Sequence, residues 1–369
     1  MADKTSSKPP TRNDVARSAG VSVATVSRAL NNSGYVKKAV KERIIKIAEE
    51  LGYNPNPIAL SLQSRKTKQL LLYQNDMTAP FNIQFLKGAA QAAYRSGYNI
   101  YLDVLCDFSR IKEQMVDGVL FSIDLLAERY LAELGKNYHL PVVTTANDPS
   151  QVFSSPVHRV VIDNDGIVNL AIDYLRSKGH RYIGLVIPGS EYGRIRYNCW
   201  KTRMCRDLGG RHTGADLEAL VIRSEFEGEG MDPSFVKHPI LYQAVEENFD
   251  SYLSIHAGRR AAAKYDRARN PATVFLCFND DMAYGFINGL RKRGIRVPED
   301  LSVMGIDGIY LRDWFDQRVT TVSIEPERIG EICVDVLIEI LEDKKPKHTN
   351  WIKHAVLEGD TVSDLNGGI

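Results

Sequence analysis

Hydroxylated and basic side chains follow a glycine near the start of the chain, in a spacing that suits contact with nucleic acid. Gly20 is followed by Ser22, Thr25, Ser27 and Arg28. Hydroxyl and guanidinium groups bond to phosphates and to base edges, and small side chains let a helix enter the major groove of DNA. These residues therefore predict a surface that contacts double-stranded DNA.

Three short helices are expected to position that surface. Thr11 and Asp14 have the spacing of a capping box, and Gly20 suits the left-handed end of a first helix. Ser22 can cap a second helix. The apolar faces comprise Val15, Ala16 and Ala19 in the first helix, Val23, Val26, Ala29 and Leu30 in the second, and Val40, Ile44, Ile47, Ala48 and Leu51 in a third that ends at Gly52. This pattern is typical of a helix-turn-helix unit, although any small capped three-helix unit would share it.

Charge is divided unequally along the chain. The whole chain has 47 Lys and Arg against 46 Asp and Glu. Residues 1–70 hold 13 of the basic residues and 5 of the acidic ones, a net charge of +8, which leaves −7 for the remainder. A solvated basic helix face could explain the positive charge of residues 1–70. A basic N-terminal part followed by an acidic remainder nevertheless favours attraction of phosphates at one end only.

A short segment rich in proline and asparagine follows the third helix. Asn54-Pro55-Asn56-Pro57 predicts an extended or turn conformation, after which residues 58–63 can form a helix. Such a helix is too short to be stable alone. The segment is therefore either a plain linker or a hinge helix that folds on DNA and inserts Leu62 into the minor groove.

The rest of the chain alternates apolar strands with helices in two series. Strands are expected at residues 70–73, 100–105, 118–122, 141–145, 159–162, 182–187, 273–278, 301–306 and 320–324, and helices at 85–95, 167–177, 195–208, 282–293 and 329–341. Continuous apolar strands alternating with helices predict an α/β fold of parallel sheets covered on both faces, here in two lobes. Ligands of such folds bind beyond the carboxyl ends of strands and between lobes.

Polar residues stand where several of these strands end. Residues 163–166 read Asp-Asn-Asp-Gly, residues 279–281 read Asn-Asp-Asp, and residues 307–308 read Asp-Gly, while Arg194 and Arg196 open a helix. Carboxylates, an amide and an arginine can hold sugar hydroxyls or another small polar ligand. Single residues could instead cap helices, as Asp165 and Asp280 would do well.

Other classes of protein are disfavoured by composition. The five cysteines have no CxxC spacing, which argues against a disulfide framework or a zinc site and favours a reducing cytoplasm. No apolar run approaches the length of a membrane span, and residues 1–10 predict a disordered arm rather than a signal peptide. No cofactor and no metal are expected.

The motifs together resemble those of the LacI family (LacI/GalR type) of bacterial transcription regulators, over nearly the whole chain. The first is Asp14-Val15-Ala16, Ala19-Gly20-Val21-Ser22, Thr25-Val26-Ser27-Arg28 and Leu30-Asn31; the second is Leu51 to Asn56 with Ala59 and Leu62; the others are residues 279–283, 297–307 and 320–322. The resemblance implies a regulator rather than an enzyme. Its fold would be a helix-turn-helix head on a two-lobed, periplasmic-binding-protein-like core.

The resemblance also implies roles for residues. Val23, Ala24 and Arg28 would face bases and Leu62 would be the minor-groove wedge. Further DNA or support contacts would come from Thr11, Ser22, Thr25, Ser27, Asn31, Tyr35, Asn56 and Ala59. A small effector, which the resemblance implies is a carbohydrate, would bind Phe81, Asp165, Arg196, Asn279 and Asp307. A homodimer would place two heads on a near-palindromic operator, and no membrane would be involved.

The expected domains follow from these motifs. They are a disordered arm (1–10), the helix-turn-helix domain (11–54), the hinge and linker (55–68) and the effector-binding and dimerisation domain (69–369). Within the last, the N-lobe would take 69–163 and 325–349, and the C-lobe 164–324 and 350–369. The family's added tetramer helix is not expected, because no leucine heptad ends the chain.

Three departures from the family pattern concern the effector site. Ile324 stands where sugar-binding members often have a polar residue, residues 103–116 are short, and residues 209–250 are long.

Two other functions remain as alternatives. A solute-binding protein of a sugar uptake system would predict an export signal and no basic head. A metal-assisted hydrolase could use Asp163, Asp165, Asp280, Asp281 and Asp307, but no nucleophile–base motif or HxxxH spacing accompanies them.

Overall fold

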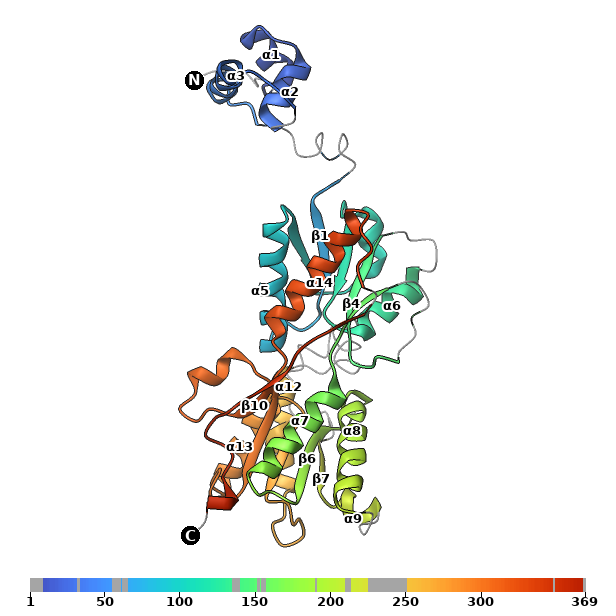
Figure 1. Ribbon diagram of the computed structural model, residues 1–369, viewed down its shortest axis with the longest axis vertical. Coiled ribbons are helices and arrows are strands. Elements are labelled where there is room, and N and C mark those ends of the chain that lie inside the picture. The colour runs from blue at the N-terminus through green and yellow to red at the C-terminus, as the bar shows by residue number, and fades with distance from the viewer. Residues whose placement is uncertain are drawn as a thin grey trace, which may run out of the picture. The chain divides into compact units, whose positions relative to one another are not determined.

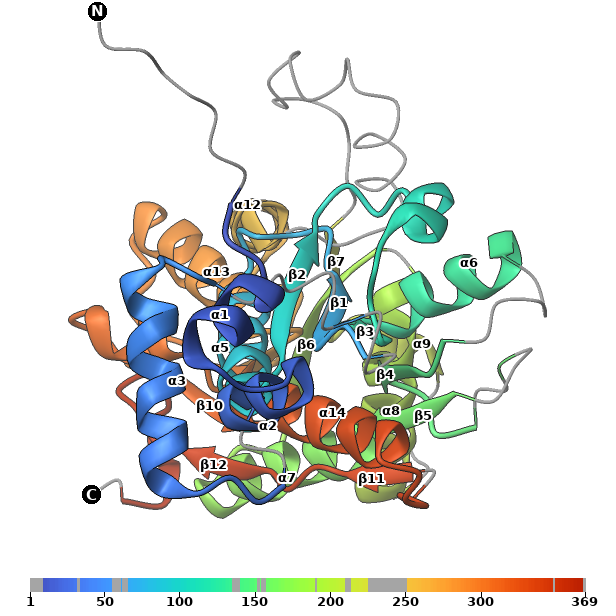
Figure 2. The ribbon, with the colours of Figure 1, turned by 90° about the horizontal axis from the view of Figure 1, so that it is seen from above.

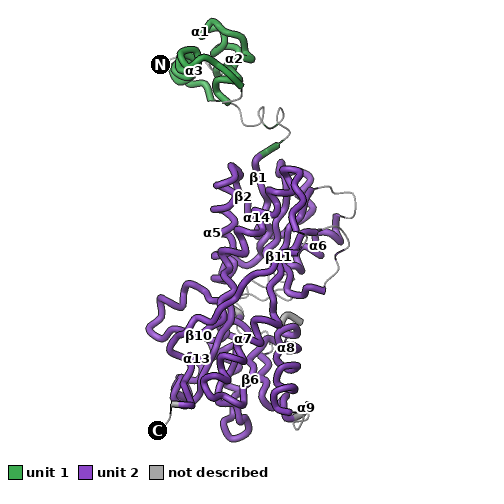
Figure 3. Tube along the Cα trace, viewed as in Figure 1, with its two compact units in different colours: residues 1–67 green, residues 68–369 purple. Residues whose placement is uncertain are grey.

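The computed structural model describes residues 9–31, 34–54, 61, 66–134, 140–150, 153, 157–189, 191–209, 214–224, 251–347 and 349–367. The chain divides into two compact units, residues 1–67 and residues 68–369, which Figure 3 shows in different colours. Each unit has its own hydrophobic core.

The first unit is a bundle of three short helices. They are α1 (Arg12–Ala19), α2 (Val23–Asn31) and α3 (Lys38–Glu50). The expected capping box between Thr11 and Asp14 is confirmed, and the Thr11 backbone N–H and hydroxyl both donate to Asp14 Oδ2, at 2.9 and 2.6 Å. Gly20 ends α1 with φ 63°, a conformation that a residue with a Cβ adopts at a cost. Val15, Val26 and Ile44 are fully buried between the helices.

The second unit contains two six-stranded sheets, one in each lobe (Figure 1). The first-lobe sheet is parallel throughout and runs in the order β11 (Thr349–Trp351), β5 (His158–Val161), β4 (Val142–Ala146), β3 (Gly118–Phe121), β1 (Gln69–Tyr73), β2 (Asn99–Asp103). The second-lobe sheet runs β12 (Ala355–Leu357), β10 (Thr320–Ser323), β9 (Ser302–Asp307), β8 (Val274–Cys277), β6 (Ile183–Pro188), β7 (Val221–Ser224), with only β12 antiparallel to its neighbour.

Helices cover both faces of the first-lobe sheet. Alternate residues of β1 enter two different cores: Leu70 and Leu72 pack with α5 (Pro80–Arg95) and α14 (Pro326–Leu341). Leu71 and Tyr73 pack with α6 (Asp124–Leu134) and the 3-10 helix η1 (Phe108–Glu113). Figure 2 shows α5 and α14 on one side of the strands and α6 on the other. A parallel sheet buried on both faces explains why these strands are apolar without alternation.

The second lobe is layered in the same way. Its helices are α7 (Asn164–Ser177), α8 (Glu191–Asp207), α9 (Gly214–Glu218), α12 (Ser251–Lys264) and α13 (Asp280–Lys292), with the 3-10 helices η3 (Tyr310–Trp314) and η4 (Leu365–Gly367). α12 and α13 cross closely, because a Cβ on Gly285 would lie 2.0 Å from the Ile255 carbonyl oxygen. α7 and α8 form another helix pair (Figure 1).

Three chain crossings join the lobes. They lie between β5 and α7 at residues 162–163, between β10 and α14 at 324–325, and between β11 and β12 at 352–354. β11 thus adds two residues to the first-lobe sheet beyond the expected boundary at residue 349, because the strand continues its pairing with β5 to Trp351. The expected strands are confirmed to within two residues at each end. No helix within the described ranges is long and apolar enough to span a membrane.

Candidate functional site

The second helix of the head presents small and charged residues outward. Val26 and Ala29 are buried against the neighbouring helices, whereas Ser22, Ala24 and Arg28 are exposed. The expectation that Val23 lies on the buried face is wrong, since 41 % of its surface is exposed. Val23 stands at the first position of α2, one turn before Val26 closes onto the core, and it is therefore part of the outer surface.

The remaining DNA-contact candidates divide into exposed residues and supports. Thr11, Asn31 and Tyr35 are exposed, and Tyr35 keeps 87 % of its surface. Thr25 and Ser27 are half-buried and their hydroxyl groups bond within the head: Thr25 Oγ1 lies 2.8 Å from Ser22 Oγ, and Ser27 Oγ accepts from Asn31 Nδ2 at 3.4 Å. These two hydroxyls therefore shape the surface around α2.

The predicted hinge contacts cannot be placed in the same way. Asn56, Ala59 and Leu62 lie outside the described residues. Ser61 and residues 66–68 are the described parts of this segment, and the Lys68 N–H donates to Asp117 Oδ2 at 2.9 Å where the second unit begins.

A second candidate site lies at the carboxyl ends of the second-lobe strands. Arg196, on α8 after β6, is 7 % exposed. Its Nε donates to Asn164 Oδ1 at 2.9 Å, and a terminal nitrogen lies 3.7 Å from Asp307 Oδ1. The other terminal nitrogen donates to the Phe278 carbonyl, and the guanidinium lies 4.7 Å from the centre of the Phe278 ring. Three chain segments thus converge on the buried guanidinium that α8 supplies.

The turn that carries Asp307 is held by a buried carboxyl group. Asp280 has no exposed surface, and its Oδ2 accepts the N–H groups of Gly308 and Ile309 at 2.9 and 3.0 Å. Asp307 has φ 120°, which is costly for a residue with a Cβ. The bonds from Asp280 explain how this conformation persists, and the conformation brings the Asp307 carboxylate to Arg196.

Burial changes the ionisation of both carboxyl groups. The pKa of Asp280 is raised to about 8, chiefly by burial and next by the charge of Asp307. Burial also raises the pKa of Asp307, to about 6, against the opposing charge of Arg196. At neutral pH, Asp280 is then largely protonated, and the ionised Asp307 balances Arg196. The cluster offers a polar ligand both donors and acceptors without net charge.

The structure separates capping residues from the other polar residues at the strand ends. Capping was the alternative for Asp165 and Asp280, but other residues hold the caps: Asp163 Oδ1 accepts the Gly166 N–H at 3.0 Å and caps α7, and Asn279 Oδ1 accepts the Met282 N–H at 2.9 Å and caps α13. Asp165 is exposed. Asn279 is thus occupied in part by its capping role, although its Nδ2 also reaches Ser254 Oγ at 3.4 Å.

Phe81 and Ile324 are the apolar residues that the family pattern relates to the effector site. Phe81 is half-buried on the first turn of α5 and packs against the main core. Ile324, 1 % exposed, lies in the second crossing, where its N–H donates to the Asp307 carbonyl at 3.2 Å.

Within the described part of the chain, no group of three or more His, Cys, Asp or Glu side chains is arranged to hold a metal ion.

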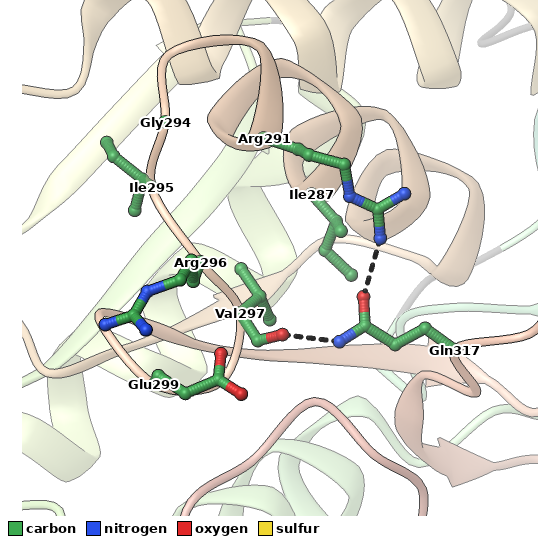
Figure 4. A pocket seen from close by; sticks show the side chains of 8 residues that line it. All are labelled: Ile287, Arg291, Gly294, Ile295, Arg296, Val297, Glu299 and Gln317. Carbon is green, nitrogen blue, oxygen red and sulfur yellow. Dashed lines mark hydrogen bonds between the residues drawn. The ribbon is translucent and has the colours of Figure 1, made fainter.

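A pocket of about 260 Å³, shown in Figure 4, includes Ile287 and Arg291 in its lining. These residues lie toward the C-terminal end of α13, whereas Asp280 is at its start. Ile287, Ile295 and Val297 form its apolar part. Arg291 donates to Gln317 Oε1 at 3.1 Å, and the Gln317 amide donates to the Val297 carbonyl. None of the residues expected to bind an effector lines this pocket, so it is separate from the Arg196 cluster.

Comparisons with known proteins agree with this architecture. Residues 11–56 match the model of the bacterial regulatory proteins of the lacI family, and residues 172–362 match a periplasmic binding protein-like domain. The HTH-type transcriptional repressor PurR of Vibrio vulnificus (strain CMCP6) is 29% identical over 365 residues, which cover 96% of this chain and 98% of that protein. PurR of Aliivibrio fischeri (strain MJ11) is 29% identical over 343 residues, 90% of this chain and 91% of the relative.

Solved structures share the fold. The lac repressor dimer bound to operator and the anti-inducer ONPF matches with a TM-score of 0.75 at 20% identity, covering 96% of this chain and all of that one. The complex of the transcriptional regulator CelR with cellobiose matches with a TM-score of 0.60 at 24% identity, covering 95% and 99%. With a matched head, a matched core and curated relatives along its length, the chain belongs to the LacI family of bacterial transcriptional regulators, which are not enzymes.

Proposed function

We propose that this protein is a transcriptional repressor whose affinity for a near-palindromic operator is controlled by a small polar effector, a sugar or sugar derivative, bound between its two lobes. The head would contact DNA through α2, and a homodimer would supply two heads. The observation that carries the proposal is the pairing, in one chain, of an outward recognition helix with a buried, charge-balanced cluster around Arg196. A repressor acts where bacterial DNA is, so the protein would work in the cytoplasm.

The outer surface of α2 supports the DNA-binding half of the proposal. Arg28 is exposed on the last turn of the helix, and Ser22, Val23 and Ala24 are small, exposed residues at its start. An arginine can make a bidentate bond to guanine, and small residues permit close approach to base edges. The similarity to relatives that are named repressors covers almost the entire chain, which favours repression over activation.

Selection of DNA from a randomised pool with the full chain tests this half. We expect enrichment of a two-fold symmetric sequence and a marked loss of enrichment in Arg28→Ala. Arg269→Ala is the matched control, since Arg269 is a highly exposed arginine of the second unit, and it should select as the unmodified chain does. Selection of no symmetric sequence would contradict the proposal.

The Arg196 cluster supports the effector half. Its guanidinium and the Asp307 carboxylate can bond to adjacent hydroxyl groups, and the Phe278 ring can pack against an apolar sugar face. Phe81, Asp165 and Asn279 are proposed as further contacts. A solute-binding role would share this cluster, but it gives no reason for the DNA-binding head or for the repressor relatives.

A thermal-shift screen of sugars, sugar phosphates and nucleosides tests the effector half, because a ligand that binds only the folded protein raises the melting temperature. We expect one chemical class to raise it in the unmodified chain and not in Arg196→Ala. The control is Arg318→Ala, an exposed arginine elsewhere in the second lobe. An unchanged response in Arg196→Ala would show that the effector binds elsewhere.

A further inference from the structure

A run of hydrogen bonds connects the first lobe to Arg196. Asp124 Oδ2 accepts the Asn147 backbone N–H at 2.9 Å. The Asn147 carbonyl accepts from Asn164 Nδ2 at 3.0 Å, and Asn164 Oδ1 accepts from Arg196 Nε at 2.9 Å. Each residue therefore bonds to the next, from the start of α6 to the middle of α8.

The run passes from one lobe to the other. Asp124 and Asn147 lie in the first lobe, at the start of α6 and directly after β4. Asn164 is the first residue of α7, just after the first crossing, and Arg196 lies on α8 in the second lobe. Asn164 thus connects the lobes, because its Nδ2 bonds to the first lobe and its Oδ1 bonds to the second.

Three of the four residues in this run are buried, so the loss of one of their hydrogen bonds is costly. Asp124, Asn164 and Arg196 are 9 %, 4 % and 7 % exposed. A buried polar group that loses its partner costs more than an exposed one, since water cannot replace the bond. The Asn164 amide also donates to the Ile162 carbonyl at 3.3 Å within the crossing, so its position is tied to the segment that connects the lobes.

We propose that Asn164 is a positioning residue that couples occupancy of the Arg196 cluster to the arrangement of the lobes. The inference rests on the proposed function, in which the effector bonds to Arg196. An effector atom that accepts from Arg196 Nε would compete with Asn164 Oδ1. The Asn164 amide would then reorient, and its bond to the Asn147 carbonyl would weaken. A local event at the effector would in this way alter a contact in the first lobe.

Hydrogen exchange of the full chain tests the coupling without DNA or effector. Arg196→Lys keeps the positive charge but removes the Nε donor to Asn164, so we expect faster exchange in the first-lobe peptide that contains the Asn147 amide. The expected change is about 2- to 30-fold, the range for mutations along a coupling network. Asn164→Asp removes the amide donor to the Asn147 carbonyl and should raise the exchange rate of the Asn147 amide by a similar factor.

The double variant Asn164→Asp, Arg196→Lys provides the decisive comparison. If the two residues act through the same run of hydrogen bonds, the double variant should exchange no faster at Asn147 than either single variant. Arg203→Lys is the matched control, because Arg203 lies on the same helix and bonds to Asp207 and Asn169 within the second lobe. It should leave Asn147 unchanged.

Two results would overturn the inference: unchanged exchange at Asn147 in both single variants, or additive changes in the double variant. Variants that fail to fold would be recognised by fast exchange throughout the second unit, and in that case Asn164→Gln, which keeps both amide atoms but displaces them by one methylene, replaces Asn164→Asp in the same comparison. Failure of the proposed function would be seen separately, as an absence of operator selection or of ligand response with the exchange coupling intact.

Discussion

Replacement of Asp280 by asparagine should change how stability depends on pH. The Asp280 carboxyl group is fully buried, and its pKa is raised from 3.8 to about 8. In the unfolded chain the same group ionises near its ordinary value. A group whose pKa is higher in the folded state stabilises the fold fully below the unfolded pKa, and that contribution is lost as the pH rises through the folded pKa.

The size of the effect follows from these values. Between pH 5 and pH 7 the unfolded chain has released the proton and the folded chain still holds it, so this one group lowers the free energy of unfolding by about 1.4 kcal/mol per pH unit, or about 3 kcal/mol in total. Asp280→Asn has no such proton. Its side-chain oxygen can still accept from Gly308 and Ile309, so the folded geometry should persist.

Urea denaturation at pH 5 and pH 7 measures the difference, with the fluorescence of the fully buried Trp200 reporting on the second lobe. We expect Asp280→Asn to gain about 3 kcal/mol relative to the unmodified chain on going from pH 5 to pH 7. Asp313→Asn, at an exposed position of η3, is the control and should follow the unmodified chain. A pH-independent difference between Asp280→Asn and the unmodified chain would refute the reasoning.

Three further predictions concern single positions. Gly305→Ala would place a Cβ 2.1 Å from Asp280 Oδ1, so it should destabilise the second unit by about 1–3 kcal/mol in urea denaturation; an unchanged midpoint would contradict the packing. Ile44→Ala should destabilise the head by about 2–5 kcal/mol and abolish operator binding, while the melting of the second unit stays within error, and joint melting would show that the two units are not independent. Leu62→Ala should weaken binding to a selected operator more than to random DNA; equal losses in a competition assay would argue against a minor-groove wedge.

Local patterns predicted most of the fold. Apolar runs such as Leu70–Tyr73 predict strands because burial on both faces leaves no polar positions. The helices α5 and α14 begin earlier than expected, at Pro80 and Pro326, and each has its proline at the start of the first turn. Proline suits the first position of a helix, but apolar periodicity does not report it.

The candidate site was predicted less completely. The sequence predicts that Arg196 and Asp307 share a site, and they do lie together. For Asp280 the sequence also allows a helix cap, whereas its bonds reach a turn 28 residues away. The signal available in the sequence was three polar residues in succession at a strand end, which cannot say which of them caps the helix. Asn164 and Asn147 depend on a pairing across a chain crossing, and no local pattern encodes such a pairing.

Operator affinity measured with and without an effector shows whether the effector site and the DNA-binding head are coupled. The measurement uses the selected operator and the compound that most raises the melting temperature of the full chain. We predict that this compound changes operator affinity by about 5-fold or more, the range of typical coupling between two sites, and that Arg196→Ala loses the change. A compound that binds the second unit yet leaves operator affinity unaltered would contradict the account.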